Sequence, residues 1–251
     1  MADKYVGKAK LSKKRKEFFI RFIFRWLILV FSLVIFFFYP ESFNVLDGLN
    51  FFKSFTPFHI LWCIWVFDML LQIIPIKSKI PLGSQKLFAF RFKPLKEKVN
   101  EKLFKKFTTS ANKRAFLIFV LWSLLIGCIG LFYYIGFFDK KILFMITALF
   151  YIFDLVCVLF WCPFRLILKT KCCTTCRIFN WDHFMMFTPM IFLTGFYSIS
   201  LVILSCIALV IWEFCVLFFP KRFFEVTNKA LQCSECTDKL CTQYCKNKCK
   251  F

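Results

Sequence analysis

Nine of the 14 cysteines in this 251-residue chain form two clusters whose spacing suits metal binding. Two residues separate Cys173 from Cys176 in the first cluster, and two separate Cys233 from Cys236 in the second. Such pairs are the short chelating units of zinc and iron–sulfur sites, because two intervening residues let backbone amides fold toward the sulfurs. The candidate metal ligands are Cys162, Cys172, Cys173, Cys176, Cys233, Cys236, Cys241, Cys245 and Cys249.

The metal that these thiols suit best is iron in [4Fe–4S] clusters, since nine thiols supply four ligands to each of two clusters with one left over. Structural zinc is the alternative, and palmitoylated or redox-sensing thiols are a third reading. A reducing compartment disfavours stable disulfides between them. The other five cysteines lie inside apolar runs and are expected to be small buried hydrophobes: Cys63, Cys128, Cys157, Cys206 and Cys215.

Three acids lie within apolar runs, namely Asp68, Asp154 and Glu213. Charged groups are costly in lipid and usually face a partner, a cavity or a proton route. If the three meet near one axis, they would suit proton or ion handling, including the protonation of a quinone. The alternative is that each acid pairs with a nearby base, such as Arg165 for Asp154.

Two adjacent polar residues, Asp182 and His183, follow the first cysteine cluster and are candidates for the second shell of a metal site. Asp182 could also cap the helix that follows. The only other histidine, His59, is expected near the opposite membrane face, so the two histidines of one chain cannot hold a haem between them.

The elements that must position these residues are membrane-spanning helices. The composition is 60% hydrophobic with 40 Phe, and apolar runs cover 18–39, 59–76, 115–138 and 142–168, each long enough to cross a hydrocarbon layer of ~30 Å. A longer run, 184–219, suits two helices joined near residues 195–200. The sequence therefore predicts an all-α protein with six transmembrane helices.

The basic residues predict how these helices are oriented. All but three of the 35 Lys and Arg residues lie in the segments 1–25, 77–114, 165–182 and 221–251, and the exceptions are Lys53, Lys140 and Lys141. By the positive-inside rule both termini are cytoplasmic in a cell membrane. The net charge of +21 mostly reflects this bias and attraction to membrane lipid. The alternative interpretation is a surface that binds an acidic soluble partner.

A repeated pattern predicts three helical hairpins. Phe67-Asp68, Phe153-Asp154 and Trp212-Glu213 are each followed by a proline where the helix ends. The expected plan is a first hairpin with a basic N-terminus (1–76), a basic amphipathic segment (77–114), a second hairpin with the cysteine cluster (115–183), a third hairpin (184–220) and a cysteine-rich tail (221–251). Together the cysteines form a cytoplasmic cap.

The motif Trp161-Cys162-Pro163 at a helix end and the tail from Cys233 to Cys249 resemble the membrane iron–sulfur proteins of the NapH, NosR and CcoG type. The other cysteine of the family's motif would fall at 158, where this chain has Val158 with Cys157 beside it. The resemblance implies electron transfer between quinol and soluble or periplasmic redox partners.

The function expected from the sequence is electron transfer through [4Fe–4S] clusters, as an oxidoreductase subunit of a larger redox complex. Partners would be membrane lipid, other redox subunits, a ferredoxin or flavodoxin, and a quinone, with no nucleic acid. The alternatives are a transporter or channel that uses the intramembrane acids, or a scaffold, each with a zinc-cysteine cap. No nucleotide-binding, zinc-protease or serine-hydrolase motif is present, and Asp182-His183 lacks the cysteine that a palmitoyltransferase motif needs.

Overall fold

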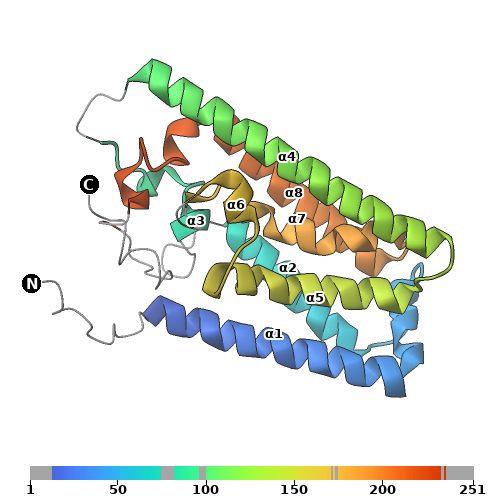
Figure 1. Ribbon diagram of the computed structural model, residues 1–251. Helices are drawn as coiled ribbons and strands as arrows, with labels where there is room; N and C mark the ends of the chain where they lie inside the picture. Colours follow the sequence, from blue (N-terminus) through green and yellow to red (C-terminus); the bar gives the residue numbers. More distant parts are fainter. Residues whose placement is uncertain are drawn as a thin grey trace, which may run out of the picture.

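The computed structural model describes residues 13–74, 82–95, 100–170, 172, 175–232 and 235. Within these ranges all regular elements are helices, and the one β-bridge, between Pro94 and Asn228, is isolated (Figure 1). The α-helices are α1 (Lys13–Phe38), α2 (Pro57–Ile73), α3 (Leu82–Gln85), α4 (Glu101–Tyr134), α5 (Lys140–Leu159), α6 (Phe164–Leu168), α7 (Asp182–Phe187) and α8 (Phe196–Phe218). Short 3₁₀ helices lie between them: η1 (Pro40–Leu46), η2 (Asn50–Phe52), η3 (Ala89–Arg91), η5 (Phe179–Trp181), η6 (Thr188–Phe192), η7 (Pro220–Arg222) and η8 (Lys229–Leu231).

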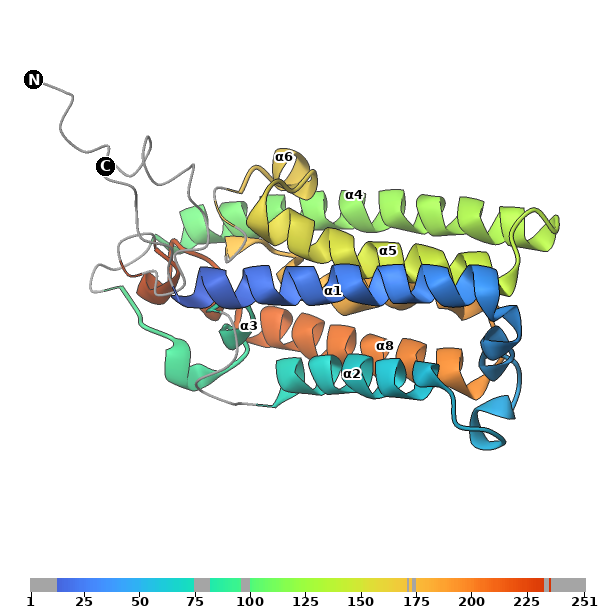
Figure 2. The same cartoon turned by 90° about the horizontal axis from the view of Figure 1, so that it is seen from below.

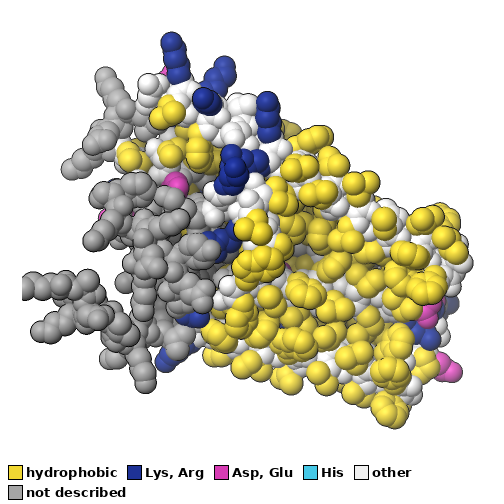
Figure 3. All heavy atoms as spheres, in the orientation of Figure 1, with side chains coloured by type: hydrophobic (Ala, Val, Ile, Leu, Met, Phe, Trp, Pro, Cys, Tyr) yellow, Lys and Arg dark blue, Asp and Glu magenta, His cyan; other side chains and the backbone are white. Residues whose placement is uncertain are grey.

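Four of the described helices, α1, α4, α5 and α8, are long and apolar enough to cross a membrane. Helix α2 is apolar but shorter, with 17 residues. Large apolar side chains such as Leu27, Leu124 and Ile203 are exposed, and the visible face of the bundle is covered by apolar groups (Figure 3). A surface of this kind is stable only in lipid, so the prediction of an all-helical membrane protein is confirmed at this level.

The predicted fifth span is not a continuous long helix. Helix α7 has six residues and η6 has five, and at about 1.5 Å per residue the two together are too short for a layer of ~30 Å. The backbone that precedes α7, from Thr175 to Trp181, is irregular and largely buried. Irregular backbone is tolerated at membrane depth where protein covers it. Six crossings are therefore not confirmed.

The turn between η6 and α8 lies close to where the sequence places it. Gly195 precedes α8, and a Cβ atom at this position would lie 2.0 Å from the carbonyl oxygen of Leu46. The amide of Phe196 also donates to the carbonyl of Gly48 at 2.9 Å. Glycine is thus required at 195 by the close approach of two backbones.

The helices do not pack as three self-contained hairpins. Helix α1 packs mainly on α5, and α2 packs mainly on α8, as Figure 2 shows from below. The helices of the first two predicted hairpins therefore find their main neighbours elsewhere, whereas α7 does pack on α8. The arrangement as three hairpins is not confirmed.

The core that holds these helices together is aromatic. Trp65 of α2 is fully buried and contacts four rings at centroid distances of 5.7 Å (Phe144), 5.8 Å (Tyr151), 5.2 Å (Phe187) and 6.4 Å (Tyr197). Such edge-on and tilted pairs are favourable beyond the area that they bury. One side chain thereby ties α2 to α5, α7 and α8.

Helix α4 is continuous across the boundary predicted between residues 114 and 115. Asn100 caps its first turn by accepting hydrogen bonds from the amides of Lys102 and Leu103. The basic first turns, expected to form an amphipathic segment, extend beyond the apolar part of α4 and pack Phe107 against Phe224 at 5.5 Å between centroids. Lys and Arg side chains gather at this end of the bundle (Figure 3).

Candidate functional site

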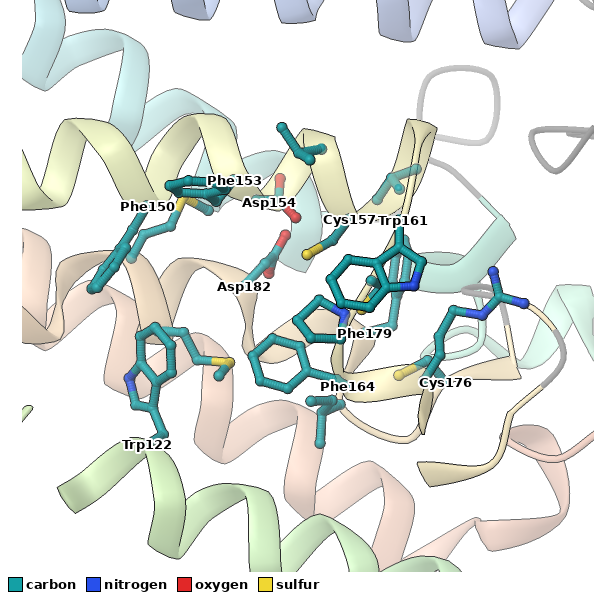
Figure 4. A pocket seen from close by; sticks show the side chains of 18 residues that line it. Trp122, Phe150, Phe153, Asp154, Cys157, Trp161, Phe164, Cys176, Phe179 and Asp182 are labelled. Atoms are coloured by element: carbon teal, nitrogen blue, oxygen red, sulfur yellow. The ribbon is translucent and has the colours of Figure 1, made fainter. Parts of the chain in front are cut away.

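A cavity of about 350 Å³ lies between α5, α4 and the chain from Trp161 to Met186. Aromatic rings form much of its wall (Figure 4): Trp122, Phe150, Phe153, Trp161, Phe164 and Phe179. The polar groups of the lining are few, namely Asp154, Cys157, Cys162, Arg165, Cys176 and Asp182. Its volume and its mostly apolar wall with a few convergent polar groups are typical of small-molecule sites.

The end of α5 shapes this cavity. The amide of Trp161 donates to the carbonyl of Val156 at 3.1 Å, a wider turn than an α-helix makes, and Pro163 cannot continue the helical hydrogen bonding. Helix α6 then ends where Lys169 adopts left-handed backbone with φ 53°. The break after α5 turns Cys162 inward, toward the cavity.

Two thiols on the cavity wall differ in acidity. A hydrogen bond with the Cys157 thiol, together with the backbone amides of Phe164 and Arg165, lowers the pKa of Cys162 to about 7 although the residue is buried. Burial raises the pKa of Cys176 to about 11. Near neutral pH Cys162 is therefore partly thiolate, the form that binds metals and attacks electrophiles, whereas Cys176 remains a thiol.

The structure brings Cys162 and Cys176, two of the candidate metal ligands, to one cavity. Cys172 is half-buried, and its carbonyl accepts hydrogen bonds from Thr175. The described part of the chain holds no group of three or more His, Cys, Asp or Glu side chains placed to bind a metal ion. The remaining candidate ligands lie outside the described residues: Cys173, Cys233, Cys236, Cys241, Cys245 and Cys249.

Cys157 is a cavity residue that the sequence interpretation assigned to the helix interior. Cys157 lines the cavity and forms a hydrogen bond with Cys162, so it lies beside the other thiols. A signal was present in the sequence, because Cys157 and Cys162 flank the predicted end of an apolar helix just before Pro163.

A smaller, polar pocket of about 70 Å³ adjoins the cavity, and Asp154 and Asp182 line both. Arg25 of α1 is buried there, with a hydrogen-bonded ion pair of 2.7 Å to Asp154 and its guanidinium carbon 3.8 Å above the ring of Tyr151. The Tyr151 hydroxyl donates to Asp68 at 2.9 Å. Asp154 is thus paired with Arg25 rather than with Arg165.

Asp182 and His183 lie at the same pocket, at the start of α7. Gln72 donates to both carboxylate oxygens of Asp182 at 3.0 and 2.9 Å, and Nδ1 of His183 lies 3.3 Å from Asp182 Oδ1. Burial opposes a charge on either residue, but their mutual attraction outweighs it. The pKa of His183 therefore lies above its ordinary value, and the pKa of Asp182 lies below its own.

Glu213, the third acid singled out in the sequence, lines neither cavity. The guanidinium of Arg177 donates to its two carboxylate oxygens at 2.9 and 2.7 Å, and the indole of Trp181 donates at 2.7 Å. Arg177 also donates to Asn112 of α4 at 3.3 Å. We call this group the Arg177–Glu213 latch, because it fixes the irregular chain before α7 to α8 and α4.

No family model matches this chain, and neither the curated proteins nor the solved structures include one that resembles it. The likeness to membrane iron–sulfur proteins is thus carried by the sequence motifs alone.

Proposed function

We propose that this chain is a membrane-embedded electron-transfer protein that holds an iron–sulfur cluster beside a cavity for the ring of a quinone. The observation that carries the proposal is the wall of the large cavity, where the thiols of Cys162 and Cys176 and the carboxylates of Asp154 and Asp182 face one aromatic-lined space. Thiols can ligate a cluster, acids can exchange protons with a quinone, and flat apolar surfaces can hold its ring.

The cavity suits a quinone for two physical reasons. Its six aromatic side chains offer flat surfaces against which a ring can stack, and it lies between α4 and α5, two helices apolar enough to cross the membrane in which quinones dissolve. Reduction of a quinone to a quinol takes up two electrons and two protons. Asp154 and Asp182 are the cavity groups able to pass protons to the bound ring.

The cluster would be held by Cys162, Cys172 and Cys176 together with cysteines outside the described residues, at position 173 and in the sequence range 233–249. A cysteine-ligated cluster supplies electrons one at a time. Basic side chains at this end of the bundle suit an acidic carrier such as a ferredoxin or flavodoxin. In this proposal both termini are cytoplasmic, and the chain works with other redox subunits.

Metal analysis tests the proposal. Protein purified without oxygen should contain iron and acid-labile sulfide, with broad absorbance near 400 nm. One [4Fe–4S] cluster gives about four iron per chain, and a second cluster on the remaining thiols gives about eight. Cys162→Ser and Cys176→Ser should each lower the iron content. Cys128→Ser, a matched change at an exposed thiol of α4, should leave it unchanged.

Colourless protein with stoichiometric zinc would contradict electron transfer and would favour a scaffold or a transporter with a zinc-cysteine cap. Iron that is unaffected by both Cys162→Ser and Cys176→Ser would mean that other thiols hold the cluster.

A transporter or channel is the second candidate function, and the polar pocket favours it. Carboxylates from α2, α5 and α7 surround a space between helices, with a buried arginine beside them. Asp154→Asn should then reduce proton or cation flux in protein-containing vesicles. Asp139→Asn, the same change at the distant cap of α5, should leave the flux as it is.

A further inference from the structure

His183 is a buried histidine with only one side of its ring satisfied. The side chain is 5% exposed, and Nδ1 contacts Asp182. Nε2 is buried too and has no hydrogen-bond partner among the described residues. A buried polar nitrogen without a partner is destabilising, because it has lost its hydrogen bonds to water. The adjoining pocket of about 70 Å³ has room for water that could bond to this nitrogen.

The charges around the pocket are unequal without a further proton. Three carboxylates and two guanidinium groups line it: Asp68 of α2, Asp154 of α5, Asp182 of α7, and Arg21 and Arg25 of α1. Tyr151 donates its hydroxyl to Asp68 and remains neutral there. Helix α8 also packs on α7, but its one acid, Glu213, is paired with Arg177.

A proton on His183 makes the positive and negative charges equal in number. Charge balance matters here because an uncompensated charge in a region of low dielectric is expensive. The carboxylate of Asp182 is the nearest group that stabilises an imidazolium, and Asp68 adds to it through space.

We propose that His183 and Asp182 form a proton-binding site within the helix bundle, at the polar pocket that α1, α2, α5 and α7 enclose. The site uses none of the candidate metal ligands, so it does not depend on the electron-transfer proposal. Because Asp182 also lines the larger cavity, a proton held here is one side chain away from any ligand bound there.

Nitrogen NMR of the full chain in lipid nanodiscs, with ¹⁵N-labelled histidine, tests the site directly. The chain has two histidines, so only two imidazole rings give signals, and His59→Gln assigns them. We expect the His183 ring to carry protons on both nitrogens at neutral pH and to lose one as the pH rises.

Asp182→Asn should move this titration to lower pH by about one unit or more, because the neutral amide no longer stabilises the imidazolium. Asp68→Asn should shift the titration in the same direction by less. This variant tests the proposal if the Asp182→Asn protein does not fold. Asp139→Asn is the control and should not move it. A His183 ring that stays neutral from pH 5 to 9, or that titrates identically in the Asp182→Asn protein, would overturn the proposal.

Discussion

Two groups of buried charges occupy the same end of the bundle, and they are built differently. In the Arg177–Glu213 latch one guanidinium meets one carboxylate through two hydrogen bonds, and Trp181 adds a third. In the polar pocket the carboxylates outnumber the positive groups until His183 is protonated, and a buried nitrogen of that histidine is left without a partner. The charges of the latch are balanced, whereas the pocket can bind one more proton.

The difference separates a structural role from a functional one. A bidentate ion pair contributes a fixed free energy once it has formed, and breaking it is costly. A cluster with unequal charges changes its energy with every proton that enters or leaves. Three acids that look equivalent in the sequence therefore have different roles. Glu213 holds a segment in place, whereas Asp68 and Asp154 face the site that can titrate.

The largest effect is expected on breaking the latch. Arg177→Met should lower the free energy of unfolding by about 3 kcal/mol, because it leaves a carboxylate without its partner in a partly buried position. Unfolding in mixed micelles, followed by circular dichroism, measures the loss. The double variant Arg177→Met/Glu213→Met should recover much of it. If the double variant is as unstable as the single one, the latch does not act as a pair.

A smaller and pH-dependent effect is expected from the pocket. The pKa of His183 is raised by Asp182, so its contribution to stability is full below the ordinary histidine value of about 6.5 and is lost as the pH rises through the raised value. The stability difference between the wild-type protein and His183→Gln should therefore shrink as the pH rises above about 6.5. Thermal unfolding at a series of pH values measures this difference, and Arg177→Met should keep the wild-type slope. Parallel profiles for wild type and His183→Gln would show that the histidine does not titrate there.

The smallest effect is expected for an ion pair at the other end of the bundle. Lys140 contacts Asp47 there, and the aspartate side chain is half exposed. Exposed pairs are worth about 0–1 kcal/mol, so Lys140→Gln should change stability by no more than that, with a loss that shrinks at high salt. A loss as large as that of Arg177→Met would mean that burial does not explain the contrast between the pairs.

Much of the helical plan could be predicted from local sequence. The apolar runs 18–39 and 59–76 correspond to α1 and α2, and the turn expected near Gly195 precedes α8. Chain length and hydropathy are local properties, so they identify helices that suit a membrane. The position of Cys162 at a helix end could be read in the same way, since Pro163 marks where α5 cannot continue.

The tertiary structure decided which distant residues meet. Arg25 and Asp154 are 129 positions apart, and no periodicity links them, so the sequence offered only a nearby base such as Arg165 as a partner of Asp154. The irregular chain before α7 looks like an ordinary loop in the sequence, yet the Arg177–Glu213 latch draws it into the bundle and carries Cys176, Asp182 and His183 with it. The sequence by itself determined that apolar helices dominate and that thiols and acids lie near their ends. Packing alone decided their grouping, because contacts between separate helices depend on how complementary side-chain surfaces and charges meet in space.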